Sequence, residues 1–267
     1  MLLGLSVAVA HADIMYQTGA DGSVLYKTDT TNGSSIAVGS LGYTAVYGDA
    51  FSPGGTLFAM VNSYTPSTLA TVNLATGAAT PVGAPTGIAD LMAIDFTPDG
   101  TLYGAAWSNN GLYTLNTSTG AATFVGLLGL GGAVMDLAWD PLNSTMYGIS
   151  SSGPSGSLLY SVNLGTGAGT LVTNISGDAC LMGLAIDSGG NFLATDWCSA
   201  NSPLYKIDTS TGALTSLGLT GIAQPMGGAI ASAAVPEPSS IVLLLTGLCG
   251  LGFVIRGTRI RQRGRTC

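Results

Sequence analysis

The sequence predicts an all-β fold, a five-bladed β-propeller of four-stranded blades, followed by a C-terminal transmembrane helix. Two observations predict the propeller: a pattern of strands and turns recurs about every 44 residues, and the chain starts and stops partway through that pattern. An apolar stretch near the C-terminus predicts the helix. We expect three parts: a signal peptide at 1–12, the β-propeller repeat domain at 13–234 and a tail at 235–267.

Residues 1–12 have the composition of a secretory signal peptide. The stretch from Leu2 to Ala10 is apolar, and Ala10-His11-Ala12 places small residues at the two positions that a signal peptidase recognises. Cleavage after Ala12 leaves Asp13 first. The positive charges that usually precede the apolar part are missing, which indicates a start codon further upstream. An edge strand or a disordered end is the alternative interpretation.

A glycine turn marks each repeat. It follows a strand such as 112–116 (Leu-Tyr-Thr-Leu-Asn) or 204–208 (Leu-Tyr-Lys-Ile-Asp). Glycine suits such turns because it adopts φ > 0 without strain. The turns are Asn32-Gly33, Thr76-Gly77, Thr119-Gly120, Thr166-Gly167 and Thr211-Gly212.

Each repeat carries three further strands in a constant order. An apolar strand, such as 92–96 or 182–186, leads through a Pro/Gly/Ser-rich turn into a second strand, such as 101–104. A short strand after the glycine turn, such as 122–126, completes the set. Four strands in roughly 44 residues is the content of one propeller blade.

The two ends of the repeat array predict closure into a ring. Residues 14–17 stand in the position of a second strand, and 226–230 stand in the position of a first strand. The last strand can therefore complete the first blade, which removes two open sheet edges. Small residues on the expected innermost strands, such as Ala93, Gly183, Ala185 and Gly228, suit a narrow five-fold ring. An open repeat array is the alternative packing.

The C-terminal tail has the charge distribution of a membrane anchor. The stretch from Ser239 to Ile255 is uncharged and spans about 26 Å as a helix, the low end of a bilayer's hydrocarbon thickness. A basic end at 256–265 follows it, so we expect the C-terminus on the cytoplasmic side. A buried core helix is the alternative. This end holds all the arginines of the chain, Arg256, Arg259, Arg261, Arg263 and Arg265.

The tail resembles the PEP-CTERM sorting signal of Gram-negative bacteria. The motif at 235–239 begins with Val235, Pro236, Glu237 and Pro238, and the apolar and basic parts follow in the same order as in that family. The resemblance implies sorting by exosortase, a membrane-embedded cysteine enzyme thought to cut near Pro-Glu-Pro. It further implies an exported protein that is first anchored in the inner membrane and then sorted to the cell envelope, outer surface or extracellular matrix. The repeats themselves resemble secreted propellers with Leu-Tyr-x-Ile-Asp-x-x-Thr-Gly units.

The composition excludes several classes of function. Residues 13–234 hold thirteen aspartates and two lysines, which leaves a net charge of −11 and makes nucleic acid an unsuitable partner. The chain has one histidine, His11, which the expected signal cleavage removes, and one glutamate, Glu237. Ser-His and Cys-His pairs and most zinc sites are therefore excluded from the exported domain. We expect no catalytic residue and no cofactor.

Aspartates and asparagines recur at two kinds of position. Asp29, Asn73, Asn116, Asn163 and Asp208 lie four residues before the turn glycines, where their side chains can bond the turn amides. A second set flanks the innermost strands, where carboxylates could line a channel or an end face and hold Ca²⁺. No calcium-binding loop motif is present, so we expect no metal. The second set comprises Asp95, Asp136, Asp140 and Asp187.

Aromatic and cysteine residues give two further hypotheses. Trp107 and Trp197 follow the second strands of their repeats, so we expect a role in blade packing. A sugar-stacking surface is the alternative, formed by these two with Trp139, Tyr43, Tyr47 and Tyr64. If Ser188-Gly189-Gly190 is a hairpin turn that pairs Ile186 with Phe192, the same register places Cys180 opposite Cys198, within disulfide reach. Two free thiols are the alternative.

Together these patterns predict a non-enzymatic, exported surface or matrix-associated protein. An exosortase system would sort it, and the propeller would act as an interaction or structural module for exopolysaccharide or other envelope proteins. Before processing, the C-terminal helix would hold it in the membrane. The alternative function is a glycan hydrolase or lyase that uses aspartates on an end face of the propeller.

Overall fold

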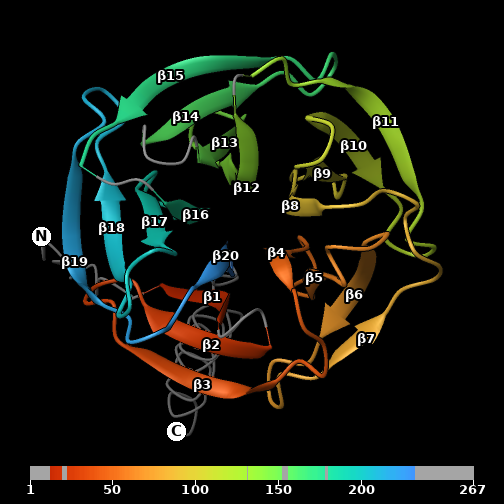
Figure 1. Ribbon diagram of the computed structural model, residues 1–267, viewed down its shortest axis with the longest axis horizontal. Coiled ribbons are helices and arrows are strands. Elements are labelled where there is room, and N and C mark those ends of the chain that lie inside the picture. Colours follow the sequence, from red (N-terminus) through yellow and green to blue (C-terminus); the bar gives the residue numbers. More distant parts are fainter. Residues whose placement is uncertain (1–12, 20–22, 131, 152–155, 178–179, 232–267) are drawn as a thin grey trace, which may run out of the picture. The chain divides into compact units, whose positions relative to one another are not determined.

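The computed structural model describes residues 13–19, 23–130, 132–151, 156–177 and 180–231. These residues belong to one compact unit, Met1–Ser232, and they form five four-stranded antiparallel sheets arranged around a central axis (Figure 1). This is the predicted five-bladed β-propeller. The signal peptide, the motif at 235–239, the helix at 239–255 and the basic end at 256–265 lie outside the described residues.

Each blade runs outward from an innermost strand that borders the axis. Blade 1 is β20 (Met226–Ile230), β1 (Ile14–Gly19), β2 (Val24–Asp29) and β3 (Ser35–Ser40). Blade 2 is β4 (Tyr47–Phe51), β5 (Leu57–Val61), β6 (Thr68–Val72) and β7 (Ala79–Pro81). Blade 3 is β8 (Leu91–Phe96), β9 (Leu102–Ala106), β10 (Gly111–Leu115) and β11 (Ala122–Leu127).

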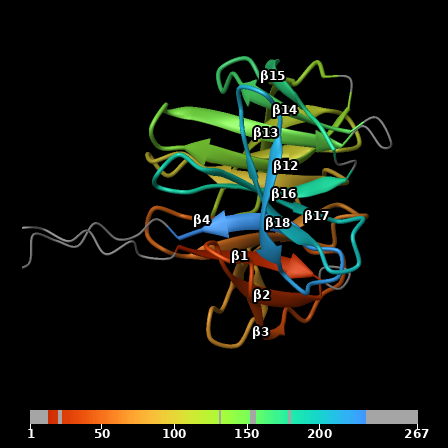
Figure 2. The ribbon, with the colours of Figure 1, turned by 90° about the vertical axis from the view of Figure 1, so that its left-hand side faces the viewer.

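Blades 4 and 5 complete the circle with the same order of strands. Blade 4 is β12 (Ala133–Asp140), β13 (Thr145–Ser151), β14 (Ser157–Val162) and β15 (Gly169–Ile175). Blade 5 is β16 (Leu181–Ile186), β17 (Phe192–Asp196), β18 (Pro203–Ile207) and β19 (Leu214–Leu219). Figure 2 shows blade 4 from the side, with β12 to β15 following one another from the middle of the molecule to its edge.

The ring closes through blade 1, as the sequence predicted. The last strand, β20, pairs antiparallel with β1 and aligns Met15 with Ile230 and Tyr16 with Ala229. The first and last segments of the propeller thus share one sheet. This pairing gives β20 a neighbouring strand and covers the edge of β1 that does not pair with β2.

The glycine turns have the predicted conformation and the predicted caps. Their glycines have φ between 74° and 81°. In each turn the side chain four residues earlier accepts a backbone hydrogen bond; Asn73 Oδ1, for example, accepts from the Ala75 amide at 2.9 Å and Asp208 Oδ1 from the Ser210 amide at 2.9 Å. The other three caps, Asp29, Asn116 and Asn163, accept equivalent bonds from Thr31, Ser118 and Gly165. The capping interpretation is therefore confirmed.

Neighbouring blades touch where a glycine turn meets the outermost strand of the preceding blade. A Cβ added to Gly77 in blade 2 would lie 2.5 Å from the Gly39 carbonyl oxygen in blade 1. A Cβ added to Gly39 would lie 2.2 Å from the Thr76 carbonyl oxygen. Real Cβ atoms do not approach oxygen this closely, so the two backbones can meet only because both residues are glycine.

The hydrophobic core consists of layers between the blades. One layer joins blades 2 and 3, where the rings of Phe58 and Phe96 lie 5.5 Å apart between centroids, and similar clusters lie between other pairs of blades. Apolar side chains on both faces of a blade are therefore buried against its two neighbours. This packing accounts for the high apolar content of a chain with few charges.

Candidate functional site

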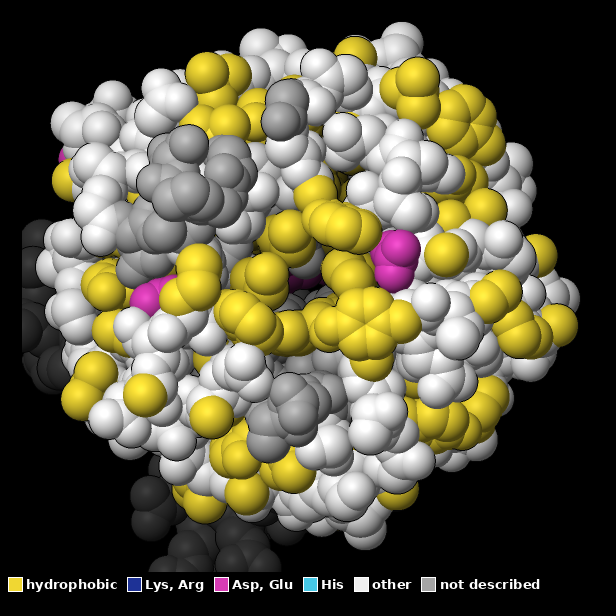
Figure 3. Space-filling model, viewed as in Figure 1, with side chains coloured by type: hydrophobic (Ala, Val, Ile, Leu, Met, Phe, Trp, Pro, Cys, Tyr) yellow, Lys and Arg dark blue, Asp and Glu magenta, His cyan; other side chains and the backbone are white. Residues whose placement is uncertain are grey.

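A hydrophobic cup lies where the first residues of the innermost strands meet. Its volume is about 220 Å³. Figure 3, which looks down the ring axis, shows hydrophobic side chains gathered around the central opening of one face. The cup is lined by Tyr47, Gly48, Tyr64, Met92, Trp107, Met135, Met182, Trp197, Met226 and Gly227.

Bulges in the innermost strands position the methionines of the cup. In β8 the register with β9 shifts by one residue between Leu91 and Ala93, so Met92 has no partner of its own across the sheet. Met135 in β12 and Met182 in β16 occupy the same place in equivalent shifts. A bulge re-aims the side chain of its extra residue, here toward the ring axis.

Two blades carry glycine where the other three carry methionine. Gly48 of β4 lies in the register shift between β4 and β5, and Gly227 of β20 lies in the shift between β20 and β1. Both have positive φ, 45° and 70°. In these two blades the residues just before the glycines, Tyr47 and Met226, supply the side chains that line the cup. The wall is therefore irregular although the blades repeat.

Aromatic residues form the rest of the wall. Trp107 and Trp197 follow β9 and β17, and their backbone amides donate to the carbonyl oxygens of Asp90 at 2.7 Å and Cys180 at 3.0 Å. Trp107 is 50% exposed, whereas the Trp197 Nε1 atom is buried without a hydrogen-bond partner. The hydroxyl groups of Tyr47 and Tyr64 are hydrogen-bonded to each other.

The structure divides the six aromatic residues considered for sugar stacking. It brings Trp107, Trp197, Tyr47 and Tyr64 to the cup. Trp139 packs into the layer between blades 3 and 4, and Tyr43 packs into the layer between blades 1 and 2. The expected packing role is thus wrong for Trp107, which is a half-exposed wall of the cup. Trp197 does pack, against the buried cluster of Tyr47, Met92 and Met226.

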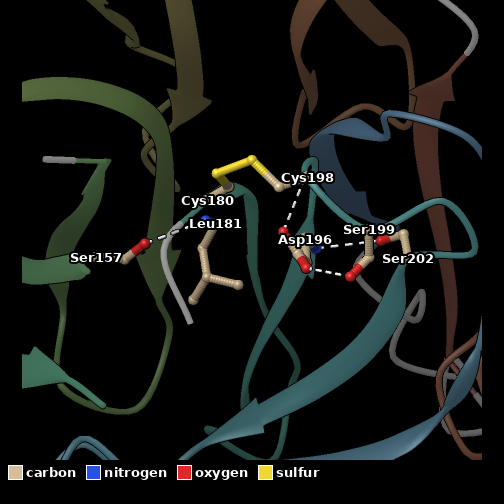
Figure 4. Close-up of a disulfide and its surroundings, with 7 residues drawn as sticks. All are labelled: Ser157, Cys180, Leu181, Asp196, Cys198, Ser199 and Ser202. Atoms are coloured by element: carbon tan, nitrogen blue, oxygen red, sulfur yellow. Dashed lines mark hydrogen bonds between the residues drawn. A yellow bond between two sulfur atoms is a disulfide. The ribbon is translucent and has the colours of Figure 1, made fainter. Parts of the chain in front are cut away.

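A disulfide joins Cys180 and Cys198 (Figure 4). The Cα atoms are 5.6 Å apart. Cys198 directly follows Trp197, which lines the cup. The expected pairing of Ile186 with Phe192 is confirmed, but the register shifts by one residue between Leu181 and Gly183. Cys180 consequently faces Trp197, whose amide donates to its carbonyl oxygen, and the bridge to Cys198 is diagonal. The expectation of directly opposed cysteines was wrong because the bulge was not foreseen.

Hydrogen bonds hold the segment around the disulfide (Figure 4). Asp196 Oδ1 accepts from the Cys198 amide at 2.9 Å, and Asp196 Oδ2 accepts from the Ser199 hydroxyl at 2.6 Å. Asp196 lies close to both sulfur atoms. Because these sulfurs are bonded to each other, they are not thiolate ligands for a metal ion. The bridge instead ties the start of β16 to the end of β17, which positions Met182 and Trp197 together.

Two carboxyl groups, the buried Asp136 and the partly buried Asp95, link the innermost strands of neighbouring blades. Asp95 of β8 accepts from the Trp139 amide of β12 at 2.5 Å, and Asp136 of β12 accepts from the Leu184 amide of β16 at 2.8 Å. Burial raises the pKa of Asp95 to about 7 and raises the pKa of Asp136 well above its usual range. The negative charges of Asp49 and Asp95 add to the effect at Asp136.

Asp49 of β4 differs from these two because neither of its carboxyl oxygens has a hydrogen bond of ordinary geometry. The side chain is 2% exposed. Burial raises its pKa well above the usual range, although the nearby Gly228 amide favours the ionised form. A Cβ added to Gly227 would lie 2.2 Å from Asp49 Oδ1, so this carboxyl lies directly beneath the floor of the cup.

None of the four predicted aspartates, Asp95, Asp136, Asp140 and Asp187, is among the residues that line the cup. Asp140 Oδ1 accepts from the Leu142 amide at 2.8 Å and Asp187 Oδ1 from the Gly189 amide at 2.9 Å, so both cap turns at the far ends of the innermost strands. Sequence reasoning missed Asp49 and the methionines of the cup. The recurrence of methionine at the start of the apolar strands was the available signal, and the glycines of blades 1 and 2 concealed its full extent.

The sorting motif (Val235, Pro236, Glu237, Pro238) and the basic residues that follow the apolar stretch remain predictions, because they lie outside the described part of the chain. Among the residues that the structure describes, no helix is long and apolar enough to cross a membrane.

Comparisons with known proteins identify the fold and no family. No protein-family model and no curated protein matches the chain. A chain in a crystal structure of a nidogen/laminin complex is 13% identical with a TM-score of 0.54, over 82% of this chain and 98% of that one. A protein of unknown function from Bacteroides thetaiotaomicron is 17% identical with a TM-score of 0.55, over 84% of this chain and 68% of that one. TolB from Acinetobacter baumannii is 14% identical with a TM-score of 0.50, over 83% of this chain and 67% of that one. At these identities the likeness is one of fold alone: this chain is a β-propeller.

Proposed function

We propose that the chain is an exported, non-enzymatic binding protein that an exosortase system sorts to the cell envelope or extracellular matrix, and that its propeller binds a partner through the hydrophobic cup. One observation carries the binding half of the proposal. The cup gathers methionine and aromatic side chains around the axis and leaves Trp107 half exposed at its wall. Concave, largely apolar pockets with few polar groups are typical of ligand sites.

The lining of the cup supports binding rather than catalysis. Its side chains are methionine, tryptophan and tyrosine, which offer contact area but neither a strong general base nor a nucleophile with a base beside it. Methionine adapts to the shape of a bound group because its side chain is unbranched and polarizable. Residues 13–231 contain no histidine, arginine or glutamate that could assist the aspartates.

Two features support export. The disulfide between Cys180 and Cys198 suits an oxidising compartment outside the cytosol. The tail at 235–267 has the three parts of a PEP-CTERM signal in order. Exopolysaccharide and other envelope proteins are the partners that such sorting would bring within reach.

Protease shaving tests the sorting half. The protein is expressed in a Gram-negative host that carries an exosortase, and intact cells are treated with protease. We expect degradation of the propeller at the surface of these cells and its retention at the inner membrane when the exosortase gene is deleted. A propeller that stays in the cytosol in both strains would contradict the proposal.

Retention in the matrix tests the binding half. We expect Trp107→Ala to release the sorted protein from the matrix into the medium, because it removes a half-exposed wall of the cup. Leu142→Ala is the matched control, since Leu142 is 64% exposed in the turn between β12 and β13, away from the cup. Equal retention of both variants and the natural protein would contradict a role for the cup.

One observation favours a second candidate, a glycan hydrolase or lyase. The pKa of Asp95, raised to about 7 by burial, is suited to a general acid near neutral pH. Against it, both oxygens of Asp95 accept backbone hydrogen bonds, from Phe96 at 2.7 Å and from Trp139. Activity on envelope glycans that survives removal of the tail and is lost in Asp95→Asn would establish the enzyme.

A further inference from the structure

We propose that the group bound in the cup is an organic cation, a quaternary ammonium whose methyl groups fill the methionine and aromatic wall. This inference rests on the proposed binding function and specifies its ligand. Three observations carry it: an unpartnered carboxyl beneath the floor, a wall suited to cations, and the absence of a positive side chain that could compete.

The unpartnered carboxyl belongs to Asp49. Both of its oxygens are buried without a hydrogen bond of ordinary geometry, and Oδ1 lies against Gly227 at the floor of the cup. Glycine at position 227 is what allows this approach, because any side chain there would meet the carboxyl. A buried carboxyl without a partner is unfavourable unless it is protonated or compensated by a positive charge. A cation in the cup would supply that compensation.

The wall suits a quaternary rather than a primary ammonium. A primary ammonium needs up to three hydrogen-bond acceptors, which methionine and tryptophan side chains do not offer. A quaternary ammonium needs none and is attracted to the faces of tryptophan and tyrosine rings. The cup's volume of about 220 Å³ suits a small group of this kind.

No positive side chain of the propeller competes for the cup. Between residues 13 and 231 the cationic residues are Lys27 and Lys206. The Lys27 Nζ atom lies 5.6 Å from the centroid of the Tyr16 ring in blade 1, and Lys206 belongs to β18, the third strand of blade 5. The domain is strongly acidic overall, which attracts cations from solution. The same acidity disfavours a ligand that carries a phosphate next to its ammonium group.

The protonation of Asp49 predicts a pH dependence of binding, which is a second way to test the proposal. The strands packed against β4 are β1, β5, β8, β12 and β20, and their charged groups are Asp95 on β8 and Asp136 and Asp140 on β12. Since burial raises the pKa of Asp49, the empty site keeps its proton to a higher pH. A bound cation favours the ionised carboxyl, so binding should release protons and strengthen as the pH rises.

Choline and its uncharged carbon isostere, 3,3-dimethylbutan-1-ol, test the inference. Binding to the full-length protein in maltoside detergent is measured by tryptophan fluorescence and calorimetry. We expect choline to bind about tenfold more tightly than the isostere, and phosphocholine to bind more weakly than choline. We also expect choline affinity to increase as the pH is raised, because burial raises the pKa of Asp49, whereas isostere affinity should stay constant.

Two variants distinguish the effect of the Asp49 charge from the effect of the domain's net charge. Asp49→Asn should weaken choline binding roughly fivefold or more and leave isostere binding unchanged. Asp208→Asn removes the same net charge at an exposed turn where three other blades carry asparagine, and it should change neither affinity. Circular dichroism confirms that both variants are folded.

The outcomes distinguish this inference from the proposed function. Equal affinities for choline and its isostere would overturn the cation and leave a neutral apolar ligand for the cup. Binding of choline that is unaffected by Asp49→Asn would also overturn it. Absence of binding by either probe would reject the inference, whereas the proposed function is decided by matrix retention of Trp107→Ala.

Discussion

The rim of this propeller, formed by its five glycine turns, repeats regularly from blade to blade. The axis, formed by the innermost strands, does not. At the rim, each of the five glycine turns has a glycine of nearly equal φ and a capping side chain four residues before it. At the axis, the bulge position holds methionine in three blades and glycine in two, and buried carboxyls occur on some innermost strands and not on others. Regular positions hold the ring together, and irregular positions form the site.

The rim should be more sensitive than the axis to a single added methyl group. Gly77→Ala would strain a residue at φ 81° and would press its Cβ against Gly39 of the preceding blade. We expect a loss of about 2–5 kcal/mol in the free energy of unfolding, from strain and overpacking together. Urea denaturation followed by fluorescence measures it.

Gly100→Ala separates the effect of backbone strain from the effect of overpacking. Gly100 also has positive φ, 86°, but an added Cβ would meet nothing within 4 Å. We expect a loss of about 1–2 kcal/mol, from backbone strain alone. Equal losses in the two variants would show that contact between blades at the rim contributes nothing.

At the axis, stability should depend on pH through the buried carboxyls. Because the folded-state pKa of Asp95 is about 7 and its usual value is 3.8, the group stabilises the fold below about pH 4 and that contribution is lost as the pH rises to 7. Asp49 and Asp136 act in the same direction. We expect the free energy of unfolding to fall by a few kcal/mol between pH 4 and pH 7.

Asp95→Asn should reduce this dependence, because asparagine does not ionise, and should leave the part that comes from Asp49 and Asp136. Denaturant titrations at a series of pH values compare the variant with the natural protein. A pH profile that is identical in both would mean that Asp95 does not carry the predicted shift.

The disulfide between Cys180 and Cys198 should contribute stability and order. The two cysteines are 18 residues apart in the sequence. Because the bridge closes a loop of this length, replacing both cysteines by serine should lower the free energy of unfolding by about 3 kcal/mol. We further expect faster hydrogen exchange at Trp197, whose amide bonds to the carbonyl oxygen of Cys180. Unchanged exchange there would show that the bridge does not position the cup.

The smallest effect belongs to the exposed caps of the rim. Asp208→Asn should leave the free energy of unfolding nearly unchanged, because asparagine accepts the same bonds at Asn73, Asn116 and Asn163. Thermal unfolding measures it. A large loss would mean that the charge of Asp208, whose pKa the Ser210 hydrogen bonds lower, matters more than its geometry.

The sequence predicted the rim well and the axis poorly, for a physical reason. Turns, caps and strand order depend on residues close together in the chain, so the pattern around Asn73 and Gly77 is readable without a structure. The bulges at Met92 and Met182 depend on how two strands align across a sheet. A register shift of one residue changes which side chains face the axis, and nothing local announces it.

What the sequence by itself determined was a ring of five blades, its closure through the first blade, its acidity and the nearness of Cys180 to Cys198. These follow from short-range patterns that recur at a constant spacing. Only the tertiary structure decided that the methionines, Trp107 and Trp197 share one cup and that Asp49 lies beneath it. Those residues come from different blades, and they meet because ring closure brings the starts of all five innermost strands to one axis.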